Sequence, residues 1–186
     1  MPTDIVQQNE PVLREIAQEI PIKNITSPRI QKILKDMKTA LASQDDGVAL
    51  AAPQIGQPLR IFVVAGAVFD MIKHDEEGGK DLVKRKSQKE VTPDMVFINP
   101  VVTKLSKTTE MMEEGCLSVR YLYGKVKRST KATVTAYNEF GKKFERGGSG
   151  ILAQIFQHET DHLDGTLFID KAIDVEDLPP PEKKKK

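Results

Sequence analysis

The segment 157–165, Gln-His-Glu-Thr-Asp-His-Leu-Asp-Gly, constrains this chain more than any other stretch. It contains the pattern His-Glu-x-x-His. Residues four apart lie on one face of a helix, so His158 and His162 can bind one metal ion together. Glu159 lies about 100° further round the helix, where it reaches a water on that metal without becoming a third ligand. Because the pattern is short, a chance match on a surface helix remains the alternative at this point.

The residues before this motif predict that its helix is buried. Ile151, Ile155 and Phe156 recur on one side at helical spacing. A glycine-rich segment, 147–150, precedes the helix, and Gly165 is a natural C-cap. A helix with so apolar a side favours a position in the middle of a sheet structure, with its metal site in a pocket.

Length and composition predict a soluble globular protein. The 186 residues indicate one catalytic domain, 1–178, followed by a flexible Pro/Lys tail, 179–186. No apolar run approaches the roughly 20 residues that a membrane helix needs, and the N-terminus lacks the layout of a secretory signal. The net charge is +1, and the four terminal lysines supply more than that excess. Bulk charge therefore argues against a nucleic-acid-binding body.

Cys116 is the only cysteine of the chain, so an intrachain disulfide is excluded. This suits the reducing cytoplasm, where we expect the protein to work. A lone cysteine is commonly a buried, small apolar residue, but a metal site with an unfilled position gives Cys116 a second explanation.

The remaining elements predict an α+β fold with antiparallel sheets packed around the C-terminal helix. Residues 11–20 show helical spacing, and Ser27 and Pro28 form a typical start for a helix over 28–44. Residues 70–90, of which 12 of 21 are charged, predict an exposed loop or insertion. The segments that indicate strands are 59–65, 95–98, 101–105, 108–113, 126–128, 131–137 and 142–146.

A catalytic metal needs three protein ligands and one open position, so two histidines leave one ligand to find. A thiolate binds divalent metals strongly, and Cys116 lies at a bend where its sulfur and the next N–H can face one site. The alternatives are acidic residues downstream of the helix, which are Asp170, Asp174, Glu176 and Asp177.

The segment 47–54, Gly-Val-Ala-Leu-Ala-Ala-Pro-Gln, is rich in small residues that allow close backbone approach. Gln54 carries its only strongly polar side chain. The segment lacks the ending of a phosphate-binding loop. A small-residue loop packed on the preceding helix is the alternative to a role in a binding site.

Three segments together resemble the peptide deformylase family, and they occur in that family's order. They are 47–54, then Glu-Gly-Cys-Leu-Ser at 114–118, then 157–165, and the early Pro-Val-Leu-Arg at 11–14 also fits. The resemblance implies an enzyme that removes the N-formyl group from the formylmethionine of newly made polypeptides and releases formate.

The resemblance also implies a role for each matching residue. Cys116, His158 and His162 are expected to hold one divalent metal, natively Fe²⁺ and replaceable by Ni²⁺, Co²⁺ or Zn²⁺, with water as the nucleophile. Glu159 is expected to act as general acid and base. The Gln54 side chain and the Leu117 N–H are expected to stabilise the oxyanion.

Other residues are candidates for binding or orienting groups. Gly47, Val48, Ala49, Ile151 and Ile155 are the candidates for lining a methionine slot, although core packing explains apolar side chains as well. Two further acidic residues, Glu114 and Asp161, are candidates for hydrogen bonds that orient the metal ligands. Capping or surface roles are the alternative for both.

The chain departs from the family pattern at three places. Position 49 is Ala where the family usually has Gly, and Arg120 stands where Pro is usual. The charged segment 70–90 is longer than a compact member needs. These differences bear on substrate preference and rate more than on the type of reaction.

Two other classes of function compete with this interpretation. A zinc metallopeptidase would take its third ligand after the helix and would not need Cys116. A structural metal site would need a fourth protein ligand, and a degenerate peptide-binding relative would not need Glu159. We expect a monomer that acts on formylmethionyl peptides and nascent chains without membrane contact. The lysines at 183–186 give a hypothetical contact with ribosomal RNA.

Overall fold

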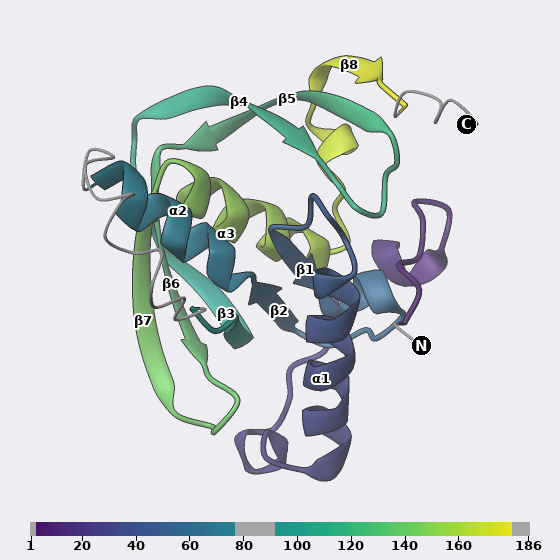
Figure 1. Cartoon of the computed structure of the whole chain (residues 1–186), viewed down its shortest axis with the longest axis vertical. Coiled ribbons are helices and arrows are strands. Elements are labelled where there is room, and N and C mark those ends of the chain that lie inside the picture. Colours follow the sequence, from purple (N-terminus) through teal and green to yellow (C-terminus); the bar gives the residue numbers. More distant parts are fainter. Residues whose placement is uncertain (1–2, 77–91, 180–186) are drawn as a thin grey trace, which may run out of the picture.

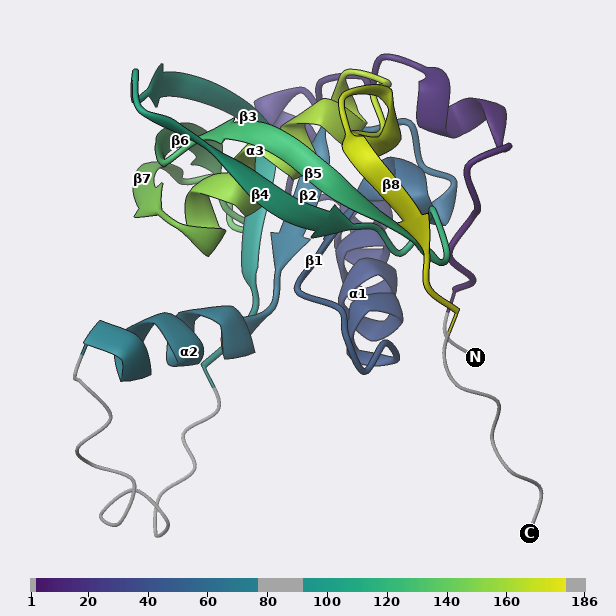
Figure 2. The same cartoon turned by 90° about the horizontal axis from the view of Figure 1, so that it is seen from above.

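The computed structural model describes residues 3–76 and 92–179. Two antiparallel sheets enclose the helix α3 (Ile151–Leu163), as Figures 1 and 2 show. The larger sheet has the order β1-β2-β3-β6-β7, and the smaller has the order β4-β5-β8. The expected α+β fold around a C-terminal helix is confirmed.

Strands of the two sheets alternate along the chain. The chain leaves the larger sheet after β3, forms the β4–β5 hairpin of the smaller sheet, and returns with β6. The strands are β1 (Ala49–Ala51), β2 (Ile61–Val64), β3 (Met95–Leu105), β4 (Thr109–Gly115), β5 (Leu122–Ser129), β6 (Lys131–Tyr137), β7 (Lys143–Ser149) and β8 (Ile173–Asp177).

The helix α1 (Pro28–Ala42) forms as its sequence predicts. The Ser27 side chain accepts a hydrogen bond from the Ile30 N–H, and Pro28 occupies the first turn. The apolar stripe, which includes Met37, packs into a core that it shares with β2 and β3. In Figure 1, α1 lies beside β1 at one side of the larger sheet.

The apolar side of α3 packs on the larger sheet. Phe156 lies against Phe97 of β3, with ring centroids 5.4 Å apart, and Phe97 stacks on Phe62 of β2 at 4.5 Å. Leu152 and Leu163 are buried in the same core. The other side of α3 faces the smaller sheet (Figure 1). His158 contacts Glu114 of β4 on this side.

Two of the expected elements differ in the structure. Residues 11–20 form only a 3-10 turn, Pro11–Arg14, because the following N–H groups of Ala17 and Gln18 donate to Leu163 and Pro58. These tertiary hydrogen bonds replace the helical ones, and Ile16, expected on an apolar stripe, is 75% exposed.

The first part of the expected charged loop or insertion, 70–90, belongs to a helix. Residues Gly66–Glu76 form the helix α2, so the first part of the segment 70–90 is helical. The rest of that segment, 77–90, lies outside the described residues, as does the predicted tail from residue 180 onward. The single-domain boundary at 178 stays a prediction.

The boundaries of the other strands shift by a few residues. β3 continues through Asn99 and Pro100, where the register with β6 slips and Asn99 adopts a φ of 49°. Of the glycine-rich segment 147–150, the first three residues form the end of β7 and pair with β6. β8, which contains three of the acidic ligand candidates, is a strand that the sequence pattern did not indicate. Across the described residues, no helix is both long and apolar enough to span a membrane.

Candidate functional site

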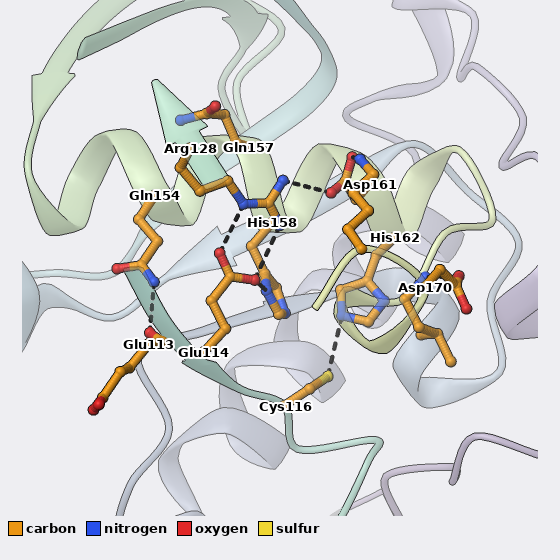
Figure 3. Close-up of polar contacts among 12 residues, drawn as sticks. Glu113, Glu114, Cys116, Arg128, Gln154, Gln157, His158, Asp161, His162 and Asp170 are labelled. Carbon is orange, nitrogen blue, oxygen red and sulfur yellow. Dashed lines mark hydrogen bonds and ion pairs between the residues drawn. The ribbon is translucent and has the colours of Figure 1, made fainter. Parts of the chain in front are cut away.

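The structure brings Cys116, His158 and His162 together between the two sheets. Their candidate ligand atoms all lie within 4.8 Å of one another, and the Cys116 Sγ lies 3.2 Å from the His162 Nε2 (Figure 3). Cys116 follows β4 directly, whereas the histidines are one turn apart on α3. The smaller sheet thus supplies the sulfur and the helix supplies both nitrogens.

The geometry of this cluster fits a divalent metal. Two ligands on one tetrahedral ion with bonds of about 2.0–2.3 Å lie roughly 3.3–3.7 Å apart. The distance of 3.2 Å between the Cys116 Sγ and the His162 Nε2 is close to this range. One thiolate and two imidazoles form a donor set that such ions accept and that leaves one position open. Among the described residues, this is the only group of three or more His, Cys, Asp or Glu side chains so arranged.

The acidic candidates for a third ligand lie elsewhere. Asp170 pairs with Arg14, and its carboxylate also accepts the Leu167 N–H. Asp174 on β8 pairs with Lys125 of the neighbouring strand. Glu176 and Asp177 are exposed on β8. The structure therefore favours Cys116 over these carboxylates.

Glu114 orients His158. Its Oε2 lies 2.9 Å from the His158 Nδ1, which leaves the Nε2 of that ring available to a metal. Arg128 donates two hydrogen bonds to the same carboxylate, from Nε at 2.7 Å and from Nη2 at 3.0 Å (Figure 3). Burial alone would raise the pKa of Glu114, but the bonds from His158 and Arg128 lower it to about 2.

Asp161 touches the cluster only through Arg128. Its Oδ2 accepts from the Arg128 Nη1 at 2.6 Å, and its Oδ1 accepts from Lys171 at 2.7 Å. Four charged side chains of alternating sign thus form a row that leads from His158 towards the surface: Glu114, Arg128, Asp161 and Lys171. Arg128 and Lys171 are the two members that the sequence analysis missed.

The thiol and His158 influence each other's ionisation. Burial raises the pKa of Cys116, but the adjacent His162 and His158 outweigh this effect and lower it to about 5. Burial lowers the pKa of His158, whereas its contacts with Cys116 and Glu114 raise it well above the usual value. Cys116 is therefore a thiolate at neutral pH, and the thiolate is the form of cysteine that binds a metal.

Glu159 is buried at 4% exposure, and its Oε2 has no hydrogen-bond partner among the described residues. Burial raises the pKa of this carboxyl to about 6, against the lowering effect of the two histidines. The His162 Nδ1 is likewise buried without a partner in the described part of the chain. An unpaired buried carboxylate costs free energy, and such groups concentrate at functional sites.

Gln54 is held with its amide N–H group towards the cluster. Its Oε1 accepts the Ala51 N–H at 2.8 Å, which fixes the orientation of the amide. Its Nε2 lies 3.2 Å from the Ser118 Oγ and 3.5 Å from the Cys116 Sγ. Ser118, fully buried, is a second neighbour of the site that the sequence analysis did not single out.

A cavity of about 320 Å³ opens onto this cluster. It lies within the usual size range of small-ligand sites. Cys116, Glu159 and Gln54 reach it. Its other lining residues include Val48, Ala49, Leu117, Ile151 and Ile155, all of them expected from the sequence.

Gly47, also expected at the site, does not line this cavity. A Cβ at this position would lie 2.8 Å from the Leu41 Cδ1, so the glycine allows close packing on α1. Ala49 of β1 does face the cavity and is 6% exposed, so its methyl group is accommodated in the cavity wall.

Comparison with known proteins agrees with this geometry. The family model for polypeptide deformylase matches residues 2–177. A chloroplastic peptide deformylase 1A of Solanum lycopersicum is 41% identical over 168 residues, which are 90% of this chain and 58% of that relative. The chain thus spans little more than half the length of this plant protein.

A bacterial relative and a solved structure cover more of both chains. The peptide deformylase of Fusobacterium nucleatum subsp. nucleatum is 39% identical over 90% of this chain and 82% of its own length. The crystal structure of a peptide deformylase from Legionella pneumophila superposes with a TM-score of 0.73 at 33% identity, over 94% of this chain and 88% of that one. With a family model matched over nearly its whole length, this chain belongs to the polypeptide deformylase family.

Proposed function

We propose that this protein hydrolyses the N-formyl group of peptides that begin with formylmethionine, and that it releases formate and a free amine. The observation that carries the proposal is the unpartnered Glu159 Oε2 beside the cluster of Cys116, His158 and His162, at the inner end of a cavity. Family membership supplies the class of reaction, and the same cluster supplies its chemistry.

Cys116, His158 and His162 would hold one divalent metal, and we propose Fe²⁺ as the native ion. When bound, such an ion lowers the pKa of a water towards neutrality and polarises a carbonyl oxygen. Glu114 keeps His158 in the tautomer that offers its Nε2 to the metal, while Arg128 holds Glu114 ionised. These contacts set the ring orientation before any ion binds.

Glu159 is proposed as the group that moves the proton. It is not needed as a ligand, it reaches the cavity, and its Oε2 has no competing partner among the described residues. The carboxylate would accept a proton from the attacking water and then donate it to the leaving nitrogen.

The oxyanion that develops on the formyl oxygen needs hydrogen-bond donors. The Gln54 amide is supported in this role by the Ala51 N–H, which fixes its oxygen and leaves its Nε2 facing the cluster. The backbone N–H of Leu117 is proposed as the second donor, because Leu117 lines the cavity next to the metal-binding cysteine.

Two edge strands beside the cavity provide a binding site for an extended peptide. β1 is an edge strand of the larger sheet, β4 is an edge strand of the smaller sheet, and residues of both line the cavity. Edge strands present unpaired backbone groups to which another strand can add. We propose that the substrate backbone lies between these edges, with its methionine side chain against Val48, Ala49, Ile151 and Ile155.

Formate release from a formyl-Met tripeptide tests this function, using protein prepared anaerobically and loaded with Fe²⁺ or Ni²⁺. Formate without cleavage of the peptide backbone is the expected result. An unformylated peptide serves as the substrate control, and mass analysis detects backbone cleavage. No formate from fully metal-loaded protein would overturn the proposal, and backbone cleavage would instead establish a peptidase.

Two substitutions separate the proposed roles. Cys116→Ala should lose both bound metal and formate release, because the cluster is left with two ligands. Glu159→Gln should retain the metal and lose turnover by about 10²–10⁴-fold, the usual effect of removing a general acid or base. Metal content by elemental analysis is measured beside the rate, and equal metal loss in both variants would contradict the assignments.

Three further expectations belong to this proposal. The protein acts as a monomer in the cytoplasm, and its terminal lysines at 183–186 contact ribosomal RNA near emerging chains. Those lysines lie outside the described residues, so their charge alone motivates the contact. Deletion of 183–186 that left ribosome affinity and its salt dependence unchanged would refute it.

A further inference from the structure

An ion pair lies at the rim of the cavity. The Arg120 Nη1 donates to the Asp46 Oδ2 at 2.6 Å, and its Nη2 donates to the Asp46 Oδ1 at 2.9 Å. The Nη2 also donates to the Gln44 Oε1 at 3.2 Å. This is the paired geometry in which a guanidinium binds a carboxylate most strongly. Both charged side chains line the cavity itself.

The pair joins two segments from different sheets. Arg120 follows Cys116 in the connection between β4 and β5, whereas Asp46 lies in the segment that leads from α1 to β1. The first segment follows β4 and the second precedes β1, and these are the two edge strands that border the cavity. The ion pair therefore lies beside the route by which an extended peptide would leave the metal site.

The arginine and the aspartate neutralise each other. The hydrogen bond from Arg120 lowers the pKa of Asp46, and the hydrogen bond to Asp46 raises the pKa of Arg120, so both are charged at neutral pH. The Arg120 side chain is 23% exposed and the Asp46 side chain 55%, so both are accessible to solvent at the cavity entrance. The guanidinium also lies 5.7 Å from the centroid of the Tyr121 ring.

Among the described residues, the other acidic, basic and thiol side chains that line the cavity are three at the proposed metal site, Cys116, His158 and Glu159, and two glutamates. Glu113 lines it and is exposed. Glu114 is also present, but its charge is taken up by Arg128 and His158. The electrostatic field at the entrance therefore depends mainly on whether the charges of Arg120 and Asp46 cancel.

We propose that Arg120 and Asp46 determine how this enzyme ranks substrates by the charge of the residue after formylmethionine. The proposal rests on the proposed function. With formylmethionine fixed at the metal cluster, the next residue passes the rim, and the neutral pair makes the parent enzyme nearly indifferent to its charge. Either member left alone imposes a preference of one sign.

The predicted preferences have opposite signs. Asp46→Asn leaves Arg120 as an unbalanced cation, so it should favour an acidic second residue. Arg120→Gln leaves Asp46 as an unbalanced anion, so it should favour a basic one. Each single substitution should change the acidic-to-basic ratio of kcat/KM by roughly threefold to tenfold at low salt, and less as salt screens the rim. The double variant, neutral again, should return close to the parent ratio.

The experiment measures kcat/KM for formyl-Met-Asp, formyl-Met-Ala and formyl-Met-Lys peptides that are otherwise identical. The ratio is taken within each variant, so differences in active fraction cancel. Arg60→Gln is the matched control. The Arg60 side chain, 16% exposed, also pairs with an exposed aspartate, Asp164, but Arg60 does not line the cavity. It should leave the ratio unchanged even if its melting temperature falls.

The outcomes separate this proposal from the function on which it rests. Opposite shifts in the two single variants, cancelled in the double variant, would establish the role of the pair. Normal deformylation of the alanine peptide with all ratios within twofold of the parent would overturn the charge proposal alone. No formate from any peptide by the metal-loaded parent would overturn the proposed function, and the charge proposal with it.

Discussion

Arg128 shows how a single residue can support a site from behind. It lies on the inward phase of β5, between apolar or small neighbours such as Val126, and it is 4% exposed. A cation in the apolar phase of a strand requires a buried acidic partner, because an unpaired buried charge is too costly. That alternation is the sequence signal that could have identified Arg128. Its partner, Glu114, is on the neighbouring strand but lies opposite Gly124, four residues before Arg128. The two long side chains meet on the side of the smaller sheet that faces α3.

Removing this guanidinium should be strongly destabilising. Arg128→Met leaves the buried Glu114 without two of its hydrogen bonds, so the free energy of unfolding should fall by about 3–5 kcal/mol. Denaturant unfolding of the metal-loaded protein measures the change.

The exposed pair of Arg14 with Asp170 provides the control for Arg128. Its side chains are 43% and 38% exposed, so Arg14→Met should cost no more than about 1 kcal/mol. Similar losses for the two arginines would contradict the importance of burial at Glu114.

At the scale of elements, the end of α3 depends on how closely another segment approaches it. Gly165 has a φ of 72°, and a Cβ there would lie 2.7 Å from the Arg14 carbonyl oxygen. The residues that follow the histidine helix therefore pack directly on the N-terminal turn. The same segment supplies the Ala17 N–H that bonds to Leu163.

Gly165→Ala should destabilise the protein by more than the conformational cost alone. The left-handed backbone costs an alanine about 1–2 kcal/mol, and the contact with Arg14 adds to it. Gly141→Ala is the matched control, because its φ is 76° and nothing lies within 4 Å of the new Cβ. Thermal unfolding compares the two, and an equal loss would mean that the N-terminal turn simply moves away.

At the scale of the whole molecule, the residues of the proposed metal site come from two parts of the fold. Cys116 belongs to the β4–β5 connection, and the histidines belong to α3, whose other side packs on the larger sheet. A bound ion would therefore add a further link between parts of the fold that already meet through side-chain packing and through the contacts of Glu114 with His158 and of Arg128 with Asp161. Any ion that binds only the native state adds to its stability.

Removal of the metal should lower the melting temperature, and reloading should restore it. At an ion concentration 100 times the dissociation constant, the gain is about 2.7 kcal/mol. Differential scanning calorimetry with and without a chelator measures it. Cys116→Ala should show little difference between the two conditions, and a full metal-dependent shift in that variant would argue that the ion binds elsewhere.

The sequence by itself determined the elements whose physics is local. The cap at Ser27 and the apolar stripe define α1, the alternating residues define β6, and the i, i+4 spacing places His158 and His162 on one face of α3. Three motifs in order were enough to indicate the family, because their residues have to converge for one reaction.

Only the tertiary structure decided which distant residues meet. Residues 11–20 have helical spacing, yet their N–H groups bond to Leu163 and Pro58, which no local pattern encodes. Glu114 meets Arg128 because both side chains reach the space between the smaller sheet and α3. Arg120 meets Asp46 because segments next to two different sheets border one cavity. Local periodicity fixes the face on which a side chain lies, whereas its partner depends on the packing of elements far apart in the sequence.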